Sequence, residues 1–172
     1  MDRNVAQQLV EAHLVSGDMV PGQEVALRVD QTLTQDATGT MVMLELEALG
    51  LDRAHTEVSV QYVDHNLLQA DERNAEDHLF SARPPAASAC GSPSRVTESP
   101  MPRTCSASAS PARRCWARTH TCAVGSLGML AVGVGGLEVA LAIAGKPLYI
   151  QMPQIWGVRL IGELPRGARR RT

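Results

Sequence analysis

The sequence predicts an α/β fold whose sheet is mostly parallel, and two observations carry that prediction. Apolar and polar residues alternate over residues 25–29 and again over residues 58–62, a pattern typical of half-buried strands. Between these segments, residues 41–49 have the character of a helix that ends at Gly50, where glycine tolerates a left-handed backbone. Strands that alternate with helices pair in parallel through crossover connections, so the first 80 residues favour a parallel sheet.

The other expected elements follow from similar signals. An N-terminal helix is capped by Asp2 or Asn4 and stops at Gly17. The remaining expected elements are a polar helix at residues 70–80, a glycine-rich helix at 125–144, and strands at 148–151 and 155–161. Core-like sequence therefore lies on both sides of a central segment.

That central segment, residues 81–119, differs in kind from its flanks. Ser, Ala, Pro, Arg and Cys fill 31 of its 39 positions, and it contains no Leu, Ile or Phe. A segment of this composition cannot bury a core, so we expect it to be irregular. The final residues, 166–172, are similarly basic and featureless.

Charge is divided unevenly along a chain whose formal net charge is only −2. Residues 1–80 carry 15 acidic and 4 basic side chains, whereas residues 81–172 carry 3 acidic and 12 basic ones. A basic half suggests a nucleic-acid-binding arm. Trp116 is the only aromatic residue of the basic segment, however, which disfavours stacking on bases, and we expect no nucleic-acid partner.

The apolar stretch at residues 123–145 is nearly long enough to cross a membrane. It contains Glu138 and several glycines and lacks a basic or aromatic flank on its N-terminal side, so we expect a buried helix and no membrane association. The N-terminus shows no secretory signal, and the four Cys residues form no Cys-x-x-Cys pair. A reducing, cytoplasmic location is therefore expected.

Two polar clusters follow predicted strands and are candidate functional loops. Residues 31–38 form one cluster, and residues 64–66, Asp-His-Asn, form the other. In parallel sheets, ligands bind in loops beyond the carboxyl ends of the strands. The alternative is that both clusters are ordinary turns or helix caps, which favour the same residue types. His13, His55 and His78 are interpreted as surface or helix residues.

Several blocks of the chain resemble the aconitase and isopropylmalate dehydratase large-subunit family, and within it the aconitate hydratases. These blocks read VPGQEVALRVDQTLTQDATGTM, TEVSVQYVDHN, ERNAEDH and HTCAVGSLGMLAVGVGGLEVALAIAGKPLYI. They occupy residues 1–80 and 120–165, in the family's order and at about its spacing. The resemblance implies an incomplete three-layer α/β/α aconitase-type domain and a hydro-lyase that interconverts citrate and isocitrate through cis-aconitate.

The resemblance also assigns candidate site residues. It implies catalytic roles for Asp64, His65 and His120, and contacts to the small tricarboxylic acid substrate for Gln35 and Thr119. A histidine held by a carboxylate can protonate a departing hydroxyl, and an amide can bind a carboxylate while staying neutral.

The family's cofactor is a [4Fe–4S] cluster held by three cysteine thiolates. The resemblance places those thiolates far C-terminal to the matching blocks. None of Cys90, Cys105, Cys115 and Cys122 corresponds to a cluster ligand. We therefore expect this chain to bind no cluster and no other metal, and to be catalytically inactive by itself.

The chain departs from the family at residues 116–121, where Trp-Ala-Arg-Thr-His-Thr stands in place of Gly-Ser-Asp-Ser-His-Thr. Arg118 thereby reverses the charge of an expected aspartate. Permitted codons for residues 94–101, regrouped one base earlier, read Pro-Gly-Asn-Gly-Val-Ser-His, which is also a family motif. Residues 115–119 regroup in the same way to Leu-Gly-Ser-Asp. The hypothesis is that residues 81–119 and 166–172 are translated out of frame.

Two other interpretations remain open at this stage. One is a non-enzymatic α/β module whose basic Ser/Arg-rich loop binds anionic partners; it predicts salt-dependent binding that is lost when residues 81–119 are deleted. The other is a membrane protein anchored through residues 123–145. Neither accounts for the family-like blocks on both sides of the central segment.

Overall fold

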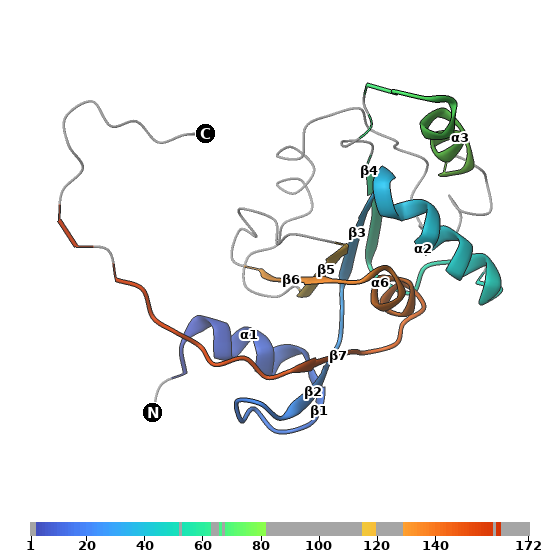
Figure 1. The fold of residues 1–172 in the computed structure, drawn as a ribbon. Helices are drawn as coiled ribbons and strands as arrows, with labels where there is room; N and C mark the ends of the chain where they lie inside the picture. The colour runs from blue at the N-terminus through green and yellow to red at the C-terminus, as the bar shows by residue number, and fades with distance from the viewer. Residues whose placement is uncertain are drawn as a thin grey trace.

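The computed structural model describes residues 3–51, 53–62, 66, 68–81, 115–119, 129–159 and 161–162. In these residues the chain forms two sheets, one antiparallel and one parallel, with helices packed beside them (Figure 1). The expected α/β class is confirmed. The expected site residues Asp64, His65 and His120 lie outside the described residues.

The antiparallel sheet has the strand order β1-β2-β7 and is built from both ends of the chain. Its strands are β1 (Leu14–Ser16), β2 (Glu24–Leu27) and β7 (Leu148–Gln151). Helix α1 (Val5–His13) precedes it and begins with a capping box, because Asn4 and Gln7 each accept a hydrogen bond from the other's backbone N–H. Apolar side chains of α1, β2 and the residue after β7 form its core: Val10, Val25, Leu27 and Met152.

The parallel sheet has the strand order β4-β3-β5-β6, and all three of its pairings are parallel. Its strands are β3 (Gln31–Gln35), β4 (Val58–Tyr62), β5 (Cys115–Thr119) and β6 (Leu130–Val134). Strand β3 is central, since it pairs with β4 on one side and β5 on the other. A parallel sheet is therefore present in this part of the chain, but the predicted strand at residues 25–29 is not in it, because β2 pairs antiparallel with β1 and β7.

Helices α2 (Asp36–Ala48) and α6 (Gly136–Ile143) pack against each other beside this sheet (Figure 1). Their buried side chains form a shared cluster: Val42, Met43, Leu46, Val139, Ala140 and Ile143. Helix α3 (Glu72–Ser81) lies against α2. The three-layer arrangement implied by the family resemblance remains a prediction.

Two loop predictions were wrong because strands occupy those positions. Residues 31–35 form the central strand β3, whose five side chains are all buried. Their polar composition indicated a loop, but the strand's polar groups find partners on β4: Thr32 Oγ1 lies 2.6 Å from Ser59 Oγ. Residues 115–119, expected to be irregular, form β5, where the backbone pairs with strands on both sides. Pairing on two edges stabilises a strand whose composition alone does not favour one.

Two further expectations near the C-terminus were wrong. The glycine-rich stretch is not one helix, because β6 ends at Val134 and α6 begins only after Gly135. Strand formation in β6 agrees with its β-branched residues Val132 and Val134. Residues 155–159 form no strand, and the side chains of Trp156 and Val158 are 79% and 86% exposed.

Candidate functional site

The carboxyl ends of the parallel strands meet at one edge of the sheet. Gln35 is the last residue of β3 and aligns with Tyr62, the last residue of β4. Strand β5 ends at Thr119 beside them, aligned with Val134 of β6. Two of the candidate residues, Gln35 and Thr119, therefore end neighbouring strands, although only the backbone of Thr119 is described. The chain enters the Asp64-His65 segment from Tyr62 and leaves it at Asn66.

Gln35 is the best-defined candidate at this edge. Its side chain is 1% exposed, and among the described residues its Oε1 atom has no hydrogen-bond partner. Gln35 is also the N-cap residue of α2, yet its side chain makes no capping hydrogen bond. A buried amide oxygen without a partner costs free energy, and such groups are retained where a ligand or water supplies the missing bond. Gln35 Oε1 is thus a buried acceptor at this edge that the described residues leave without a donor.

Asp36, the first residue of α2, joins three elements at the same edge. Its side chain is 1% exposed, and its Oδ2 atom accepts a hydrogen bond from the backbone N–H of Asn66 at 2.7 Å. The Nε2 atom of His78, on α3, lies 3.3 Å from the same oxygen. The position of Asp36 in the first helical turn also favours a negative charge there.

His78 uses both of its ring nitrogens in this cluster. Its Nδ1 atom lies 3.0 Å from the Nε2 amide of Gln69, which is a donor. A neutral ring with its hydrogen on Nε2 satisfies both contacts, because Nδ1 then accepts from Gln69 and Nε2 donates to Asp36. His78 lies on a helix, as expected, and its side chain is 16% exposed.

Sequence reasoning missed the contact between Asp36 and His78. The two residues are 42 positions apart, and neither has a spacing that marks a pair. The only signal was that Asp36 falls next to Gln35 and that His78 ends one of the family-like blocks, ERNAEDH.

A row of buried polar side chains on β3 and β4 packs beside the start of α2. Thr34 Oγ1 donates a hydrogen bond to Gln61 Oε1 across β3 and β4. Gln61 in turn lies against Gly39 of α2, where a Cβ atom would meet its amide group. Because Thr34 and Gly39 lie on either side of Gln35 in the sequence, this row fixes the junction between β3 and α2.

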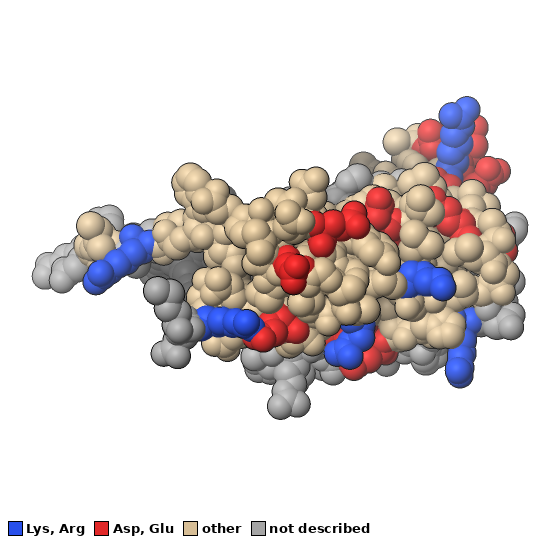
Figure 2. Space-filling model, turned by 90° about the horizontal axis from the view of Figure 1, so that it is seen from below, with Lys and Arg blue, Asp and Glu red and all other residues tan. Residues whose placement is uncertain are grey.

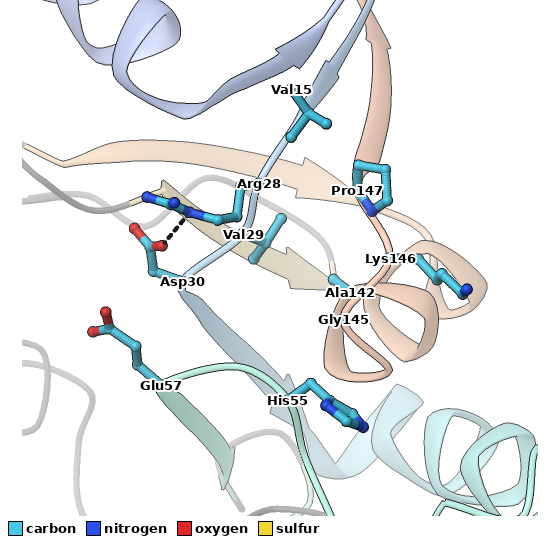
Figure 3. Close-up of a pocket in the computed structure, with 10 residues that line it drawn as sticks. All are labelled: Val15, Arg28, Val29, Asp30, His55, Glu57, Ala142, Gly145, Lys146 and Pro147. Atoms are coloured by element: carbon cyan, nitrogen blue, oxygen red, sulfur yellow. Dashed lines mark hydrogen bonds and ion pairs between the residues drawn. The ribbon is translucent and has the colours of Figure 1, made fainter.

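The structure also contains a pocket of about 610 Å³ at the opposite edge of the parallel sheet (Figure 3). It is lined by one residue each of β1 and α6, by residues that precede β3 and β4, and by the turn between α6 and β7: Val15, Ala142, Arg28, Val29, Asp30, His55, Glu57, Gly145, Lys146 and Pro147. Arg28 is directed toward Asp30, with its Nε atom 3.3 Å from Asp30 Oδ1. The pocket is thus separate from the edge that carries Gln35, and its charged groups are of both signs.

One face of the molecule shows charged side chains of both signs (Figure 2). On the face shown in Figure 2, Lys and Arg side chains are interspersed with Asp and Glu and do not gather in one basic patch. No helix within the described part of the chain is long and apolar enough to cross a membrane.

The described residues do not fit an iron–sulfur cluster. Within them, no three side chains of His, Cys, Asp or Glu come together in a way that could hold a metal ion. Of the four cysteines, only Cys115 falls in a described segment, and only its backbone is placed. No step of the chemistry is therefore derived through a cluster.

Comparison with known proteins finds similarity in one region of the chain. The model of the aconitase family (aconitate hydratase) matches residues 118–171. Aconitate hydratase A of Staphylococcus aureus (strain MW2) is 42% identical over 50 residues, that of Thermus thermophilus 46% and that of Streptococcus mutans 44%. Each aligned segment covers 29% of this chain and 6% of the relative's length. The family match includes β6, α6 and β7, which link the parallel sheet to the antiparallel one.

Proposed function

We propose that this chain is an aconitase-family fragment and part of a hydro-lyase resembling aconitate hydratase, because the family model matches residues 118–171. The reaction class is the removal and re-addition of water on a small tricarboxylic acid, with citrate, cis-aconitate and isocitrate as the species exchanged. The observation that connects this reaction to a site is the Oε1 atom of Gln35 at the carboxyl edge of the parallel sheet, which is buried and has no hydrogen-bond partner among the described residues.

In this proposal, the candidate residues divide between binding and proton transfer. Gln35 and Thr119 contact the substrate through an amide and a hydroxyl group. Asp64 and His65 act as an acid pair, in which the carboxylate holds the imidazole that protonates the departing hydroxyl. His120 is the third proton-transfer candidate. The parallel pairing of β3, β4 and β5 supports the grouping, because the three strands end at a common edge.

We also propose that this chain does not complete the reaction alone. In the family, a [4Fe–4S] cluster supplies the Lewis acid that polarises the hydroxyl group of the substrate. The described residues offer no cluster site, and the family resemblance places the cluster thiolates outside the matching blocks. What this chain's own residues do is bind and orient the carboxylates and hold protons beside them.

Citrate titration of the purified chain, followed by two-dimensional NMR, tests the binding half of the proposal. We expect weak binding with shifts at the end of β3, and loss of that binding in Gln35→Ala. Gln154→Ala is the matched control, because Gln154 is an exposed glutamine that lies far from Gln35 in the sequence. If citrate produces no shifts in the wild-type chain, or binds Gln35→Ala equally well, the assignment of the substrate site is wrong.

A turnover assay tests the second half of the proposal, which is that this chain does not complete the reaction alone. After incubation with iron and sulfide under reducing conditions, the chain is expected to show no hydration of cis-aconitate above background. Hydration that depends on bound iron and sulfide would overturn the proposed inactivity.

The unusual composition of residues 81–119 and 166–172 is proposed to result from out-of-frame translation of an aconitase-like gene; for the second segment the proposal stands against the family match, which runs to residue 171 in the frame given. Of the 12 basic residues after residue 80, 10 lie in these two segments, which agrees with GC-rich codons read out of frame. Sequencing the coding DNA across codons 78–122 and beyond codon 165 decides this point. The proposal fails if no one-base regrouping restores the family motif.

A further inference from the structure

The contacts around Asp36 point to a role that goes beyond binding by Gln35 itself. We propose that Asp36 and His78 form a clamp that positions the Gln35 amide at the carboxyl edge of the parallel sheet. This inference rests on the proposed function, because it assigns Gln35 to the substrate.

Gln35 and Asp36 are consecutive residues, and the peptide bond between them is the first part of the clamp. Gln35 ends β3 and Asp36 starts α2, so any rotation of the helix start moves the Gln35 side chain. The Gln35 side chain makes no capping hydrogen bond that would hold it to α2. Its orientation therefore depends on what fixes the neighbouring backbone.

The Asp36 side chain holds that backbone in place through contacts with two other elements. Its Oδ2 atom accepts from the Asn66 backbone N–H at 2.7 Å and faces His78 Nε2 at 3.3 Å. Asn66 follows β4 and His78 belongs to α3, so one carboxylate joins the start of α2 to two other elements. Hydrogen bonds to an ionised group are stronger than neutral ones, and burial shields this one from competing water.

The hydrogen-bond pattern assigns His78 to positioning rather than to proton transfer. Gln69 Nε2 donates to Nδ1 of the ring, and Nε2 faces Asp36. With both nitrogens engaged, the ring has no free nitrogen to offer a substrate. A residue at position 78 whose side chain donates a hydrogen bond to Asp36 should therefore be able to replace His78.

Four variants of the full chain test the clamp: Asp36→Ala, His78→Ala, His78→Gln and Asn4→Ala. We expect Asp36→Ala to lower the hydrogen-exchange protection of the Asn66 amide by about tenfold, the loss typical of a hydrogen bond to a charged group. We expect Asp36→Ala and His78→Ala to weaken citrate binding by about tenfold, and His78→Gln, which keeps a donor, to restore most of it.

Asn4→Ala controls for a general loss of stability. It removes the cap of α1, which is remote from the clamp, and is expected to lower stability while leaving citrate affinity and Asn66 protection unchanged. The clamp is refuted if Asn66 protection is unchanged in Asp36→Ala, or if that variant binds citrate as well as the wild-type chain does. If the wild-type chain binds no citrate, the proposed function fails, and the clamp as a positioning device for substrate fails with it. Reduced Asn66 protection in Asp36→Ala would then identify a purely structural contact.

Discussion

His13 Nε2 lies 2.9 Å from Asp30 Oδ2, and this buried pair ties α1 to the chain just before the central strand β3. The side chains of His13 and Asp30 are 1% and 7% exposed. The other ring nitrogen, Nδ1, lies 2.7 Å from the carbonyl oxygen of Leu9. Both ring nitrogens of His13 therefore face oxygen atoms, one of a carboxylate and one of a backbone carbonyl.

Removal of one partner of this pair is expected to be costly. We predict that Asp30→Ala lowers the free energy of unfolding by about 1–3 kcal/mol, because the buried Nε2 atom of His13 loses its hydrogen-bond partner. Urea unfolding followed by circular dichroism measures the change. Asp18→Ala, at an exposed position before β2, is the matched control and should be nearly neutral. Equal midpoints for Asp30→Ala and Asp18→Ala would contradict the prediction.

Gly39 is expected to be intolerant of a side chain. A Cβ atom at this position would meet the amide of Gln61, which is held by Thr34. We predict that Gly39→Ala costs about 1–3 kcal/mol, the range typical of overpacking a filled interior. Gly157→Ala is the control, because a Cβ at Gly157 meets nothing within 4 Å. Thermal unfolding of the two variants side by side provides the measurement, and a stabilised Gly39→Ala would show that the row can rearrange.

The carboxyl group of Glu45 is expected to make stability depend on pH. Burial raises its pKa above the ordinary 4.5, and the nearby carboxylate of Glu138 raises it further. Among the described residues, its Oε2 atom is buried without a hydrogen-bond partner. The folded state therefore favours the protonated form of Glu45. The stability that this protonation contributes is fully present below pH 4.5 and is lost as the pH rises through the raised pKa of Glu45.

Glu45→Gln should therefore be more stable than the wild-type chain at neutral pH and should flatten this part of the pH profile. Glu47→Gln removes the same charge from an exposed position on the same helix and should leave the profile unchanged. Urea midpoints measured on both sides of pH 4.5 compare the three proteins. A profile that is identical for Glu45→Gln and the wild-type chain would exclude Glu45 as the source.

Sequence patterns predicted the strands with apolar alternation well and missed the strands with polar side chains. The predicted strands at residues 58–62 and 148–151 were confirmed with the same bounds as β4 and β7. Strand β3 was missed because its threonines and glutamines are buried and partnered by side chains on β4, a long-range effect that local composition does not report.

The candidate site was predictable only in part, for a similar reason. The rule that ligands bind beyond the carboxyl ends of parallel strands directed attention to Gln35, which the structure places at the end of β3; its role stays a prediction. The contact between Asp36 and His78 depends on how α3 packs against α2, and a sequence alone does not fix that packing. The roles of Asp64, His65, Thr119 and His120 remain predictions.

The position of β5 in the sheet has a consequence for how the chain is made. Strand β5 pairs with β3 but comes much later in the sequence, after β4 has already paired with the other side of β3. During synthesis, the backbone edge of β3 therefore stays open until residues 115–119 leave the ribosome. An unpaired strand edge is a template for pairing with other chains, so we expect the part of the chain made before residues 115–119 to be prone to wrong association.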